Sequence, residues 1–413
     1  MNERPATPAA AAGVDLRTIV FAAIGIIAVL ALPFVRVRPN RVADGVLQLI
    51  VQLDPPAAVG LALIWLAAAG CAVAPLSAQV RGRVTAAASL LVPFLMILYA
   101  GAVCRRLGGS DPIARISLST GFWITMLASY AAFISASARP AAGGPQDATR
   151  PGVLRRRSAI LRRLPAVAVP VVLAAMLLSG LLDPVSVMRE FSVQKNVFFA
   201  ETGTHAALSG AAVLIGGVIG VAIGVLALRR AVFRRVAFFI VNIVQTIPSL
   251  ALFGLLILPL AALSTRFPLL HSWGISGIGR APALIALSFY AMLPIARNTY
   301  TGLEQIPASL RDAGKGMGMT HGQLLARVEV PLALPLILAG VRTAAVQSVG
   351  NTVVTALIGA GGLGVFIFQG LGQFASDMIL LGTLPVIAMA VLTDMLMGGL
   401  VRAVTPKPLR EPA

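Results

Sequence analysis

Long apolar stretches alternate with short polar ones along most of this chain, and this pattern is the first guide to its elements. A run of about 18 apolar residues is long enough to cross a hydrocarbon layer of about 30 Å as a helix. The pattern predicts ten membrane-spanning helices, and an even number places both termini on one side. Their expected ranges are 17–35, 57–76, 84–104, 120–137, 165–182, 204–228, 236–262, 282–299, 333–358 and 378–401.

Composition supports a membrane protein. Of the 413 residues, 58% are hydrophobic and only 12% are charged, and the mean hydropathy is +0.89. Soluble domains carry about 25% charged residues, so this chain lacks the polar surface that water requires. The 40 glycines and 27 prolines are tolerated in membrane helices, where small residues allow close packing. We therefore predict an all-α polytopic membrane protein.

The net charge of +18 could indicate nucleic-acid binding, but the basic residues lie between the apolar segments. That distribution is typical of loops retained in the cytoplasm. If the loop 304–331 is cytoplasmic, the inner segments after residue 138 hold eighteen Lys and Arg, and the outer ones hold only Arg189, Lys195, Arg266 and Arg280. Before residue 139 six arginines fall in proposed outer segments against four in inner ones, so the orientation there stays open. We expect no removable signal peptide in the stretch Met1 to Asp15.

A segment rich in Pro, Gly and Arg, residues 138–164, is typical of a cytoplasmic linker. It would separate an N-terminal four-helix membrane unit, residues 1–137, from the rest of the chain. The expected order after it is an additional span with an external segment over 165–203, a core over 204–402 and a cytoplasmic tail over 403–413. The core contains a polar loop, 302–335, between two spans.

This loop is too polar to span the membrane and has helical features. Pro307–Lys315 favours a short helix, which Gly314, Gly316 and Gly318 would end in a sharp turn. A second short helix is expected from Thr320 to Arg327, with Thr320 as its N-cap and Gln323 three residues later. A helix–turn–helix of this kind can fill a groove on a partner protein. The residues alone equally allow an amphipathic loop that lies on lipid headgroups.

The spacing within the loop is more specific. Asp312-Ala313-Gly314 is followed after three residues by Gly318 and after nine more by Val328, and Pro331 closes the pattern. This spacing resembles the EAA loop of binding-protein-dependent ABC importer permeases. The resemblance implies that the loop docks into a cleft of a cytoplasmic ATPase. Asp312 replaces the usual glutamate, Gly314 the second alanine, and Val328 and Val330 the usual isoleucine and leucine.

Further segments narrow the resemblance to one family. Gln245–Ile257, Gly302–Met319 and Ala356–Leu371 resemble permeases of glycine betaine, choline and related osmoprotectant importers. Ala31–Arg41 and Arg115–Trp123 resemble a long-chain, low-affinity betaine subgroup with extra N-terminal helices. The resemblance implies a type I ABC importer fold in a bacterial inner membrane. The implied partners are a second permease copy or a related one, a cytoplasmic ATPase and an external substrate-binding protein.

Polar residues within predicted spans are candidates for a translocation pathway. Either they line such a route, or they kink a helix and hydrogen-bond between neighbouring helices. The pathway candidates are Asn242, Gln245, Thr246, Ser249, Gln347, Asn351 and Thr352. Asp394 also lies in a span, where it could couple protons or pair with Arg342 or Arg402.

Other motifs suggest no chemistry in this chain. The glycine-rich run Gly359–Gly364 lacks the Lys-Ser/Thr of a phosphate loop, so an external turn is expected there. The scattered histidines and the two cysteines, Cys71 and Cys104, have no metal-ligand spacing. We expect no catalytic residues, no metal and no cofactor in this chain, with ATP and Mg²⁺ bound by the partner ATPase. Alternatives are a permease for another small solute such as an amino acid, an ion-coupled secondary transporter, and a membrane scaffold that does not transport.

Overall fold

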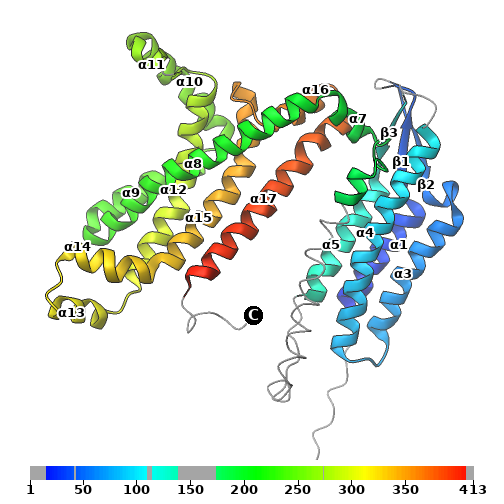
Figure 1. Ribbon diagram of the computed structural model, residues 1–413, viewed down its shortest axis with the longest axis horizontal. Coiled ribbons are helices and arrows are strands. Elements are labelled where there is room, and N and C mark those ends of the chain that lie inside the picture. The colour runs from blue at the N-terminus through cyan, green and yellow to red at the C-terminus, as the bar shows by residue number, and fades with distance from the viewer. Residues whose placement is uncertain (1–14, 41–42, 109–113, 138–173, 273, 406–413) are drawn as a thin grey trace, which may run out of the picture. The chain divides into compact units, whose positions relative to one another are not determined.

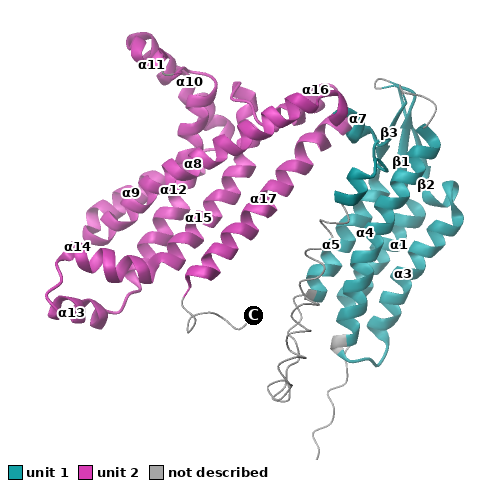
Figure 2. Ribbon diagram, viewed as in Figure 1, with its two compact units in different colours: residues 1–190 teal, residues 191–413 magenta. Residues whose placement is uncertain are grey.

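The computed structural model describes residues 15–40, 43–108, 114–137, 174–272 and 274–405. Internal contacts divide the chain into two compact units, residues 1–190 and 191–413 (Figure 2). The predicted linker, 138–164, and the first half of the predicted span 165–182 lie outside the described residues. The division predicted there therefore stays a prediction.

The first unit is a helical bundle with a small sheet at one end (Figure 1). Its helices are α1 (Leu16–Ala31), α2 (Ile50–Leu53), α3 (Pro55–Val73), α4 (Ala78–Gly108) and α5 (Thr120–Ser137). The core gathers around fully buried Trp65 and Phe34. Gly25 on α1 makes room for the indole ring, because a Cβ there would lie 2.5 Å from ring atoms of Trp65.

The first unit also contains a three-stranded sheet, which the sequence did not predict. The strands are β1 (Pro33–Arg38), β2 (Val46–Leu49) and β3 (Arg115–Leu118). They form an antiparallel sheet in the order β2-β1-β3. The helix expected over 17–35 ends at Ala31, because the residues after Leu32 pair with β2 and β3 instead of continuing the helix.

Arginines at the sheet end of the first unit form specific contacts. Arg105 donates to the carbonyl oxygen of Gly180 at 3.0 Å, and Arg189 donates to that of Ala114 at 2.7 Å. Arg115 lies 3.5 Å from the buried carboxylate of Glu190. These contacts bring residues 174–190 onto the first unit. Two of the six arginines that the sequence placed in outer segments, Arg105 and Arg115, therefore have structural partners.

The second unit is a helical bundle built around α12 (Figure 1). Helix α7 (Ser186–Val193) runs across the division between the units. The helices that follow are α8 (Lys195–Arg229), α9 (Ala231–Thr246), α10 (Ser249–Arg266), α11 (Pro268–Ser272), α12 (Arg280–Glu304), α13 (Ala308–Gly316), α14 (His321–Leu324), α15 (Val330–Thr352), α16 (Gly364–Gly372) and α17 (Ser376–Val404). A π-helical turn, Leu325–Glu329, joins α14 to α15, and a 3-10 turn, Val353–Ile358, follows α15.

Glycines let α8 and α15 approach α12 closely. A Cβ at Gly220 of α8 would lie 2.8 Å from the carbonyl oxygen of Met292, and one at Gly340 of α15 would lie 2.8 Å from that of Pro294. Both carbonyl groups belong to α12. Such close backbone approach is how membrane helices gain packing energy without a hydrophobic driving force.

The expected count of ten spans is not confirmed. Among the described residues, six helices are long and apolar enough to cross a membrane: Pro55–Val73, Val80–Gly108, Lys195–Arg229, Ser249–Arg266, His321–Ile358 and Ser376–Val404. Two shorter apolar helices cover Leu16–Ala31 and Thr120–Ala136. The single helix predicted over 236–262 is wrong. It is divided into α9 and α10, because Pro248 has no N–H to continue the hydrogen-bond ladder.

Candidate functional site

The loop between α12 and α15 folds as a helix, a turn and a second helix. Helix α13 covers Ala308–Gly316, within one residue of the predicted range. Gly318 then turns the chain with a φ of +78°, a conformation that glycine adopts without steric cost. Thr320 caps α14 through its side-chain oxygen, and the Gln323 side chain accepts from the Thr320 N–H at 2.9 Å. The predicted capping box is therefore confirmed.

Arg311 fastens α13 to both of its neighbours. Its Nε lies 2.7 Å from Oε1 of Glu329 in the π-helical turn, and its Nη2 donates to the carbonyl oxygen of Leu303 near the end of α12 at 2.6 Å. The Glu329 side chain is only 10% exposed. Charge-assisted bonds of this kind are roughly twice as strong as neutral ones. Arg311 thus links the outgoing helix, the loop helix and the returning helix.

Gly314 closes the helix–turn–helix on its inner side. It is the buried residue of α13, and a Cβ there would lie 2.5 Å from Cδ1 of Leu324 on α14. The alanine that the family pattern places here would therefore press on Leu324. Glycine at position 314 leaves this space to Leu324, whose side-chain end would otherwise have to shift.

The opposite face of α13 is open. Asp312, Ala313 and Lys315 are exposed, and Met317 just after the helix is 71% exposed. Asp312 and Lys315 lie 3.8 Å apart on the surface, where an ion pair contributes little to stability. The face therefore combines a methionine with polar residues that remain available to a partner.

The second helix of the loop continues further than predicted. It does not end before Pro331 but passes through the π-helical turn into α15, with half-buried Val328 inside the turn and exposed Pro331 in the first turn of α15. Pro331 cannot donate to a carbonyl four residues back. The π-helical turn adjusts the pairing just before it, because the N–H of Val330 reaches the carbonyl of Leu325. The loop is therefore continuous with the spanning helix.

A second set of contacts holds the end of α12 beside the loop. The hydroxyl of Tyr300 donates to Glu304, and Arg234 of α9 donates to that hydroxyl. Arg234 also lies 3.9 Å from the Glu304 carboxylate and 5.4 Å from the centre of the Tyr300 ring. This cluster ties α9 to the α12 end from which the loop departs.

Of the pathway candidates, Asn242 and Gln245 on α9 bond to α12. Arg297 donates to Oδ1 of Asn242 at 2.7 Å, and Nε2 of Gln245 donates to the carbonyl oxygen of Tyr290 at 2.9 Å. These two side chains therefore act in helix packing in this structure. The same contacts leave Asn242 half-buried.

Thr246 and Ser249 flank the break between α9 and α10. The Thr246 hydroxyl donates to the carbonyl oxygen of Ile243 at 2.7 Å within its own helix, and Ser249 begins α10. The Tyr290 hydroxyl donates to the carbonyl oxygen of Ile247 at 2.5 Å, so α12 supplies a partner for backbone freed at the break. These residues support a broken helix, one of the two interpretations of the sequence.

The candidates on α15 do not share one environment. Gln347 is exposed and lines a cavity, Asn351 is half-buried, and Thr352 is fully buried with its hydroxyl bonded to the Ser348 carbonyl at 2.7 Å. The structure therefore brings Gln347 but not Thr352 to an open surface. A pathway role for the α9 and α15 residues stays a prediction.

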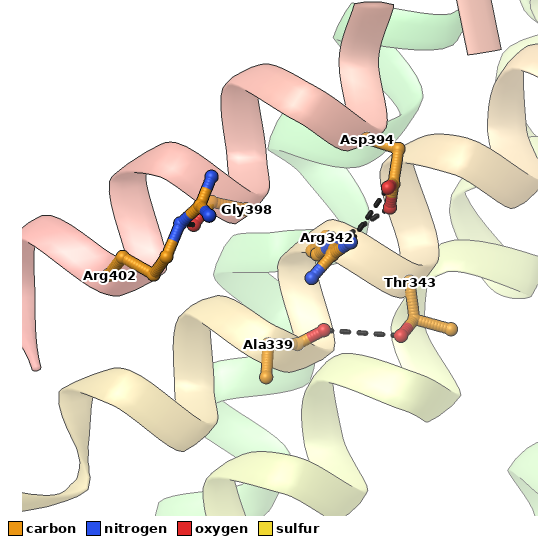
Figure 3. Close-up of polar contacts among 6 residues, drawn as sticks. All are labelled: Ala339, Arg342, Thr343, Asp394, Gly398 and Arg402. Atoms are coloured by element: carbon orange, nitrogen blue, oxygen red, sulfur yellow. Dashed lines mark hydrogen bonds and ion pairs between the residues drawn. The ribbon is translucent and has the colours of Figure 1, made fainter. Parts of the chain in front are cut away.

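Asp394 of α17 forms a paired contact with Arg342 of α15 (Figure 3). Nε and Nη2 of Arg342 lie 2.6 Å and 2.7 Å from the two carboxylate oxygens. Arg402, the other partner considered from the sequence, donates instead to the Gly398 carbonyl of its own helix at 3.2 Å. The two-pronged geometry fits the planar guanidinium to the carboxylate.

The glycine-rich turn 359–364 binds protein groups. Positive φ angles of 74°, 86° and 91° at Gly359, Gly361 and Gly362 shape it. The N–H of Gly362 donates to the Glu201 carboxylate, and the N–H of Leu363 donates to Nδ1 of buried His205 at 3.3 Å. The turn thus docks on α8, and the carboxylate and imidazole occupy N–H groups that a phosphate would need.

Sequence reasoning missed Arg311 and Glu329 as a pair. The only indication in the sequence was a basic residue within the first loop helix and an acidic residue shortly after the second. Within the described ranges, no group of three or more His, Cys, Asp or Glu is arranged to hold a metal ion.

Comparison with known proteins matches both units to families. Residues 216–408 match the family described as binding-protein-dependent transport system inner membrane component, and residues 15–188 match the family described as ABC transporter permease YehY, N-terminal domain. A solved inward-facing structure of the MetNI methionine ABC transporter aligns at 28% identity over 52% of this chain and 98% of that one, with a TM-score of 0.44.

Two relatives share about half of the chain and most of their own length. The glycine betaine/carnitine/choline transport system permease protein OpuCB of Bacillus subtilis is 40% identical over 210 residues, which are 51% of this chain and 89% of that protein. The osmoprotectant import permease protein OsmW of Salmonella typhimurium is 40% identical over 209 residues, 51% of this chain and 92% of that protein. The chain therefore belongs to the family of inner-membrane permease components of binding-protein-dependent transport systems.

Proposed function

We propose that this permease imports glycine betaine or related quaternary-ammonium osmoprotectants. The proposal is supported by relatives named as permeases for glycine betaine, carnitine, choline and osmoprotectants. Its working complex contains two permease copies, a cytoplasmic ABC ATPase that binds ATP and Mg²⁺, and an external substrate-binding protein. The chain crosses a bacterial inner membrane several times, with both termini in the cytoplasm.

The observation that carries the coupling role is the braced loop. Asp312, Ala313 and Met317 present an open face, while Arg311 holds α13 rigidly against Leu303 and Glu329. A rigid link is required if movement of the ATPase is to reach α12 and α15 rather than bend the loop. ATP binding then favours one access state of the bundle over the other, which is a two-state mechanism driven by differential binding.

Substrate affinity resides mainly in the external binding protein. Quaternary ammonium groups are usually held by aromatic cages, and this chain has only 3 Trp and 4 Tyr. The permease therefore offers a weakly binding route. Weak binding suits a route that must also release its solute.

The test is reconstitution of the purified permease with its ATPase and binding protein in liposomes. Labelled glycine betaine, carnitine, choline, proline and methionine are supplied outside, with ATP inside. Uptake of the quaternary ammonium compounds that needs ATP and both partners supports the proposal. Uptake of amino acids alone would favour another small solute, and ATP-independent uptake abolished by an ionophore would favour a secondary transporter.

A further inference from the structure

The Arg342–Asp394 pair lies deep within two long apolar helices. Arg342 is twelve residues from Val330, the start of α15, and Asp394 is ten residues from Val404, the end of α17. At 1.5 Å per residue these separations are about 18 Å and 15 Å. Both helices are longer than a hydrocarbon layer of about 30 Å, and the two charged groups lie inside the spans predicted over 333–358 and 378–401.

The pair is nevertheless open on one side. The two side chains are 41% and 45% exposed, and they border a cavity of about 430 Å³ that Ala339, Thr343, Val346 and Gln347 also line. Charged groups that face lipid at this depth are costly, and intramembrane ion pairs usually face a bundle interior or water. The cavity side of α15 and α17 is therefore turned toward an aqueous route or toward the partner copy.

The lining of the cavity favours a small zwitterion. Arg342 offers a planar guanidinium group that can bind both oxygens of a carboxylate, and Asp394 offers a carboxylate that attracts an ammonium group. Among the described residues that line it, none is aromatic, so binding would be weak. Gly398 adds room, because a Cβ there would lie 3.2 Å from Cζ of Arg342.

We propose that Arg342 and Asp394 form a site in the transport route for zwitterionic solutes, and that the pair opens to receive one. The carboxylate of the solute takes the place of Asp394 on Arg342, and its quaternary ammonium group lies against the released Asp394 carboxylate. Without solute the two side chains satisfy each other, so neither is left unpaired in the membrane. The inference rests on the proposed function, since it requires a substrate with both charges.

The test compares two substrates that differ in charge. Glycine betaine carries a carboxylate and choline does not, so only the first uses Arg342. Uptake of both labelled compounds is measured in the reconstituted complex, with the same binding protein and ATPase throughout. The selectivity of these partners then cancels when the uptake ratio of a variant is compared with that of the wild type. We expect Arg342→Gln to lower the ratio of glycine betaine to choline uptake about tenfold or more. Asp394→Asn should reduce the uptake of both.

Arg402→Gln is the matched control, because it removes one positive charge from α17 outside the cavity. It should leave the ratio unchanged. Equal losses for both substrates in Arg342→Gln would overturn the proposal and leave the pair as a brace between helices. If Arg342→Gln fails to assemble with the ATPase, Arg342→Lys decides in its place, with a reduced ratio supporting the site and an unchanged ratio overturning it. Wild-type uptake of neither compound would refute the proposed function itself.

Discussion

The guanidinium of Arg311 lies 2.7 Å from the carboxylate of Glu329, and this single contact joins the loop helix to the helix that enters the membrane. The same side chain reaches the carbonyl of Leu303, so both helices that flank the loop are held by one residue. The loop is therefore built to move with α12 and α15.

Arg311→Ala should uncouple ATP hydrolysis from uptake. The substitution leaves the Glu329 carboxylate, only 10% exposed, without its cation, and an unpaired charge of this kind strongly disfavours the native arrangement. We expect solute uptake per ATP hydrolysed to fall about tenfold. The control is Arg327→Ala, which changes an exposed arginine in the π-helical turn that also holds Glu329. Its uptake per ATP hydrolysed should stay near that of the wild type. Normal coupling in Arg311→Ala would show that the brace is dispensable.

Gly318→Ala should weaken ATPase binding. The left-handed φ of +78° costs a residue with a Cβ about 1–2 kcal/mol, although the space around it is open. Gly316→Ala is matched to it, since that position is equally open and ends a helix with ordinary geometry. Titration of the ATPase against both variants in detergent checks the difference. Equal affinities would mean that the turn does not position α13.

His205→Ala should destabilise the second unit. The imidazole bridges the backbone of Val349 at 2.9 Å and that of Leu363 at 3.3 Å, and it is fully buried. Loss of two buried bonds and of the ring volume should cost about 2–4 kcal/mol. Thermal unfolding in detergent measures the loss. His271→Ala, at an exposed histidine, provides the comparison, and a similar change there would argue against the bridge.

Gly220→Val should separate α8 from α12. The added side chain would meet the Met292 carbonyl at 2.8 Å, and overpacking of this kind typically costs about 1–3 kcal/mol. Gly210→Val, on the same helix with open space around it, separates this effect from that of helix propensity. Yield of the folded protein and its unfolding temperature give the readout. Equal stability of the two variants would contradict the close packing of α8 on α12.

Features set by neighbouring residues could be predicted from the sequence. The Thr320 cap depends on Gln323 three positions away, and helix α13 depends on Pro307 and the glycines after it. The break after Thr246 was only partly anticipated, because Pro248 allows either a kinked helix or two helices. The spacing of Asp312, Gly318 and Pro331 was sufficient to suggest the family.

Contacts between distant residues could not be predicted in this way. Arg311 and Glu329 are 18 positions apart, and Arg342 and Asp394 are 52 apart, so only the packing of the helices brings them together. The strand β1 was missed because its valines continue an apolar run that already predicts a helix. Its identity as a strand depends on pairing with the distant strand β3, which no local pattern reveals.

The most direct measurement is uptake of labelled glycine betaine by liposomes that contain the permease, its ATPase and its binding protein. We expect accumulation that requires internal ATP and both partners and that survives a protonophore, and we expect uptake per ATP hydrolysed to fall about tenfold in Arg311→Ala. Accumulation without the ATPase, or no uptake of any quaternary ammonium compound by an assembled and ATP-hydrolysing complex, would contradict it.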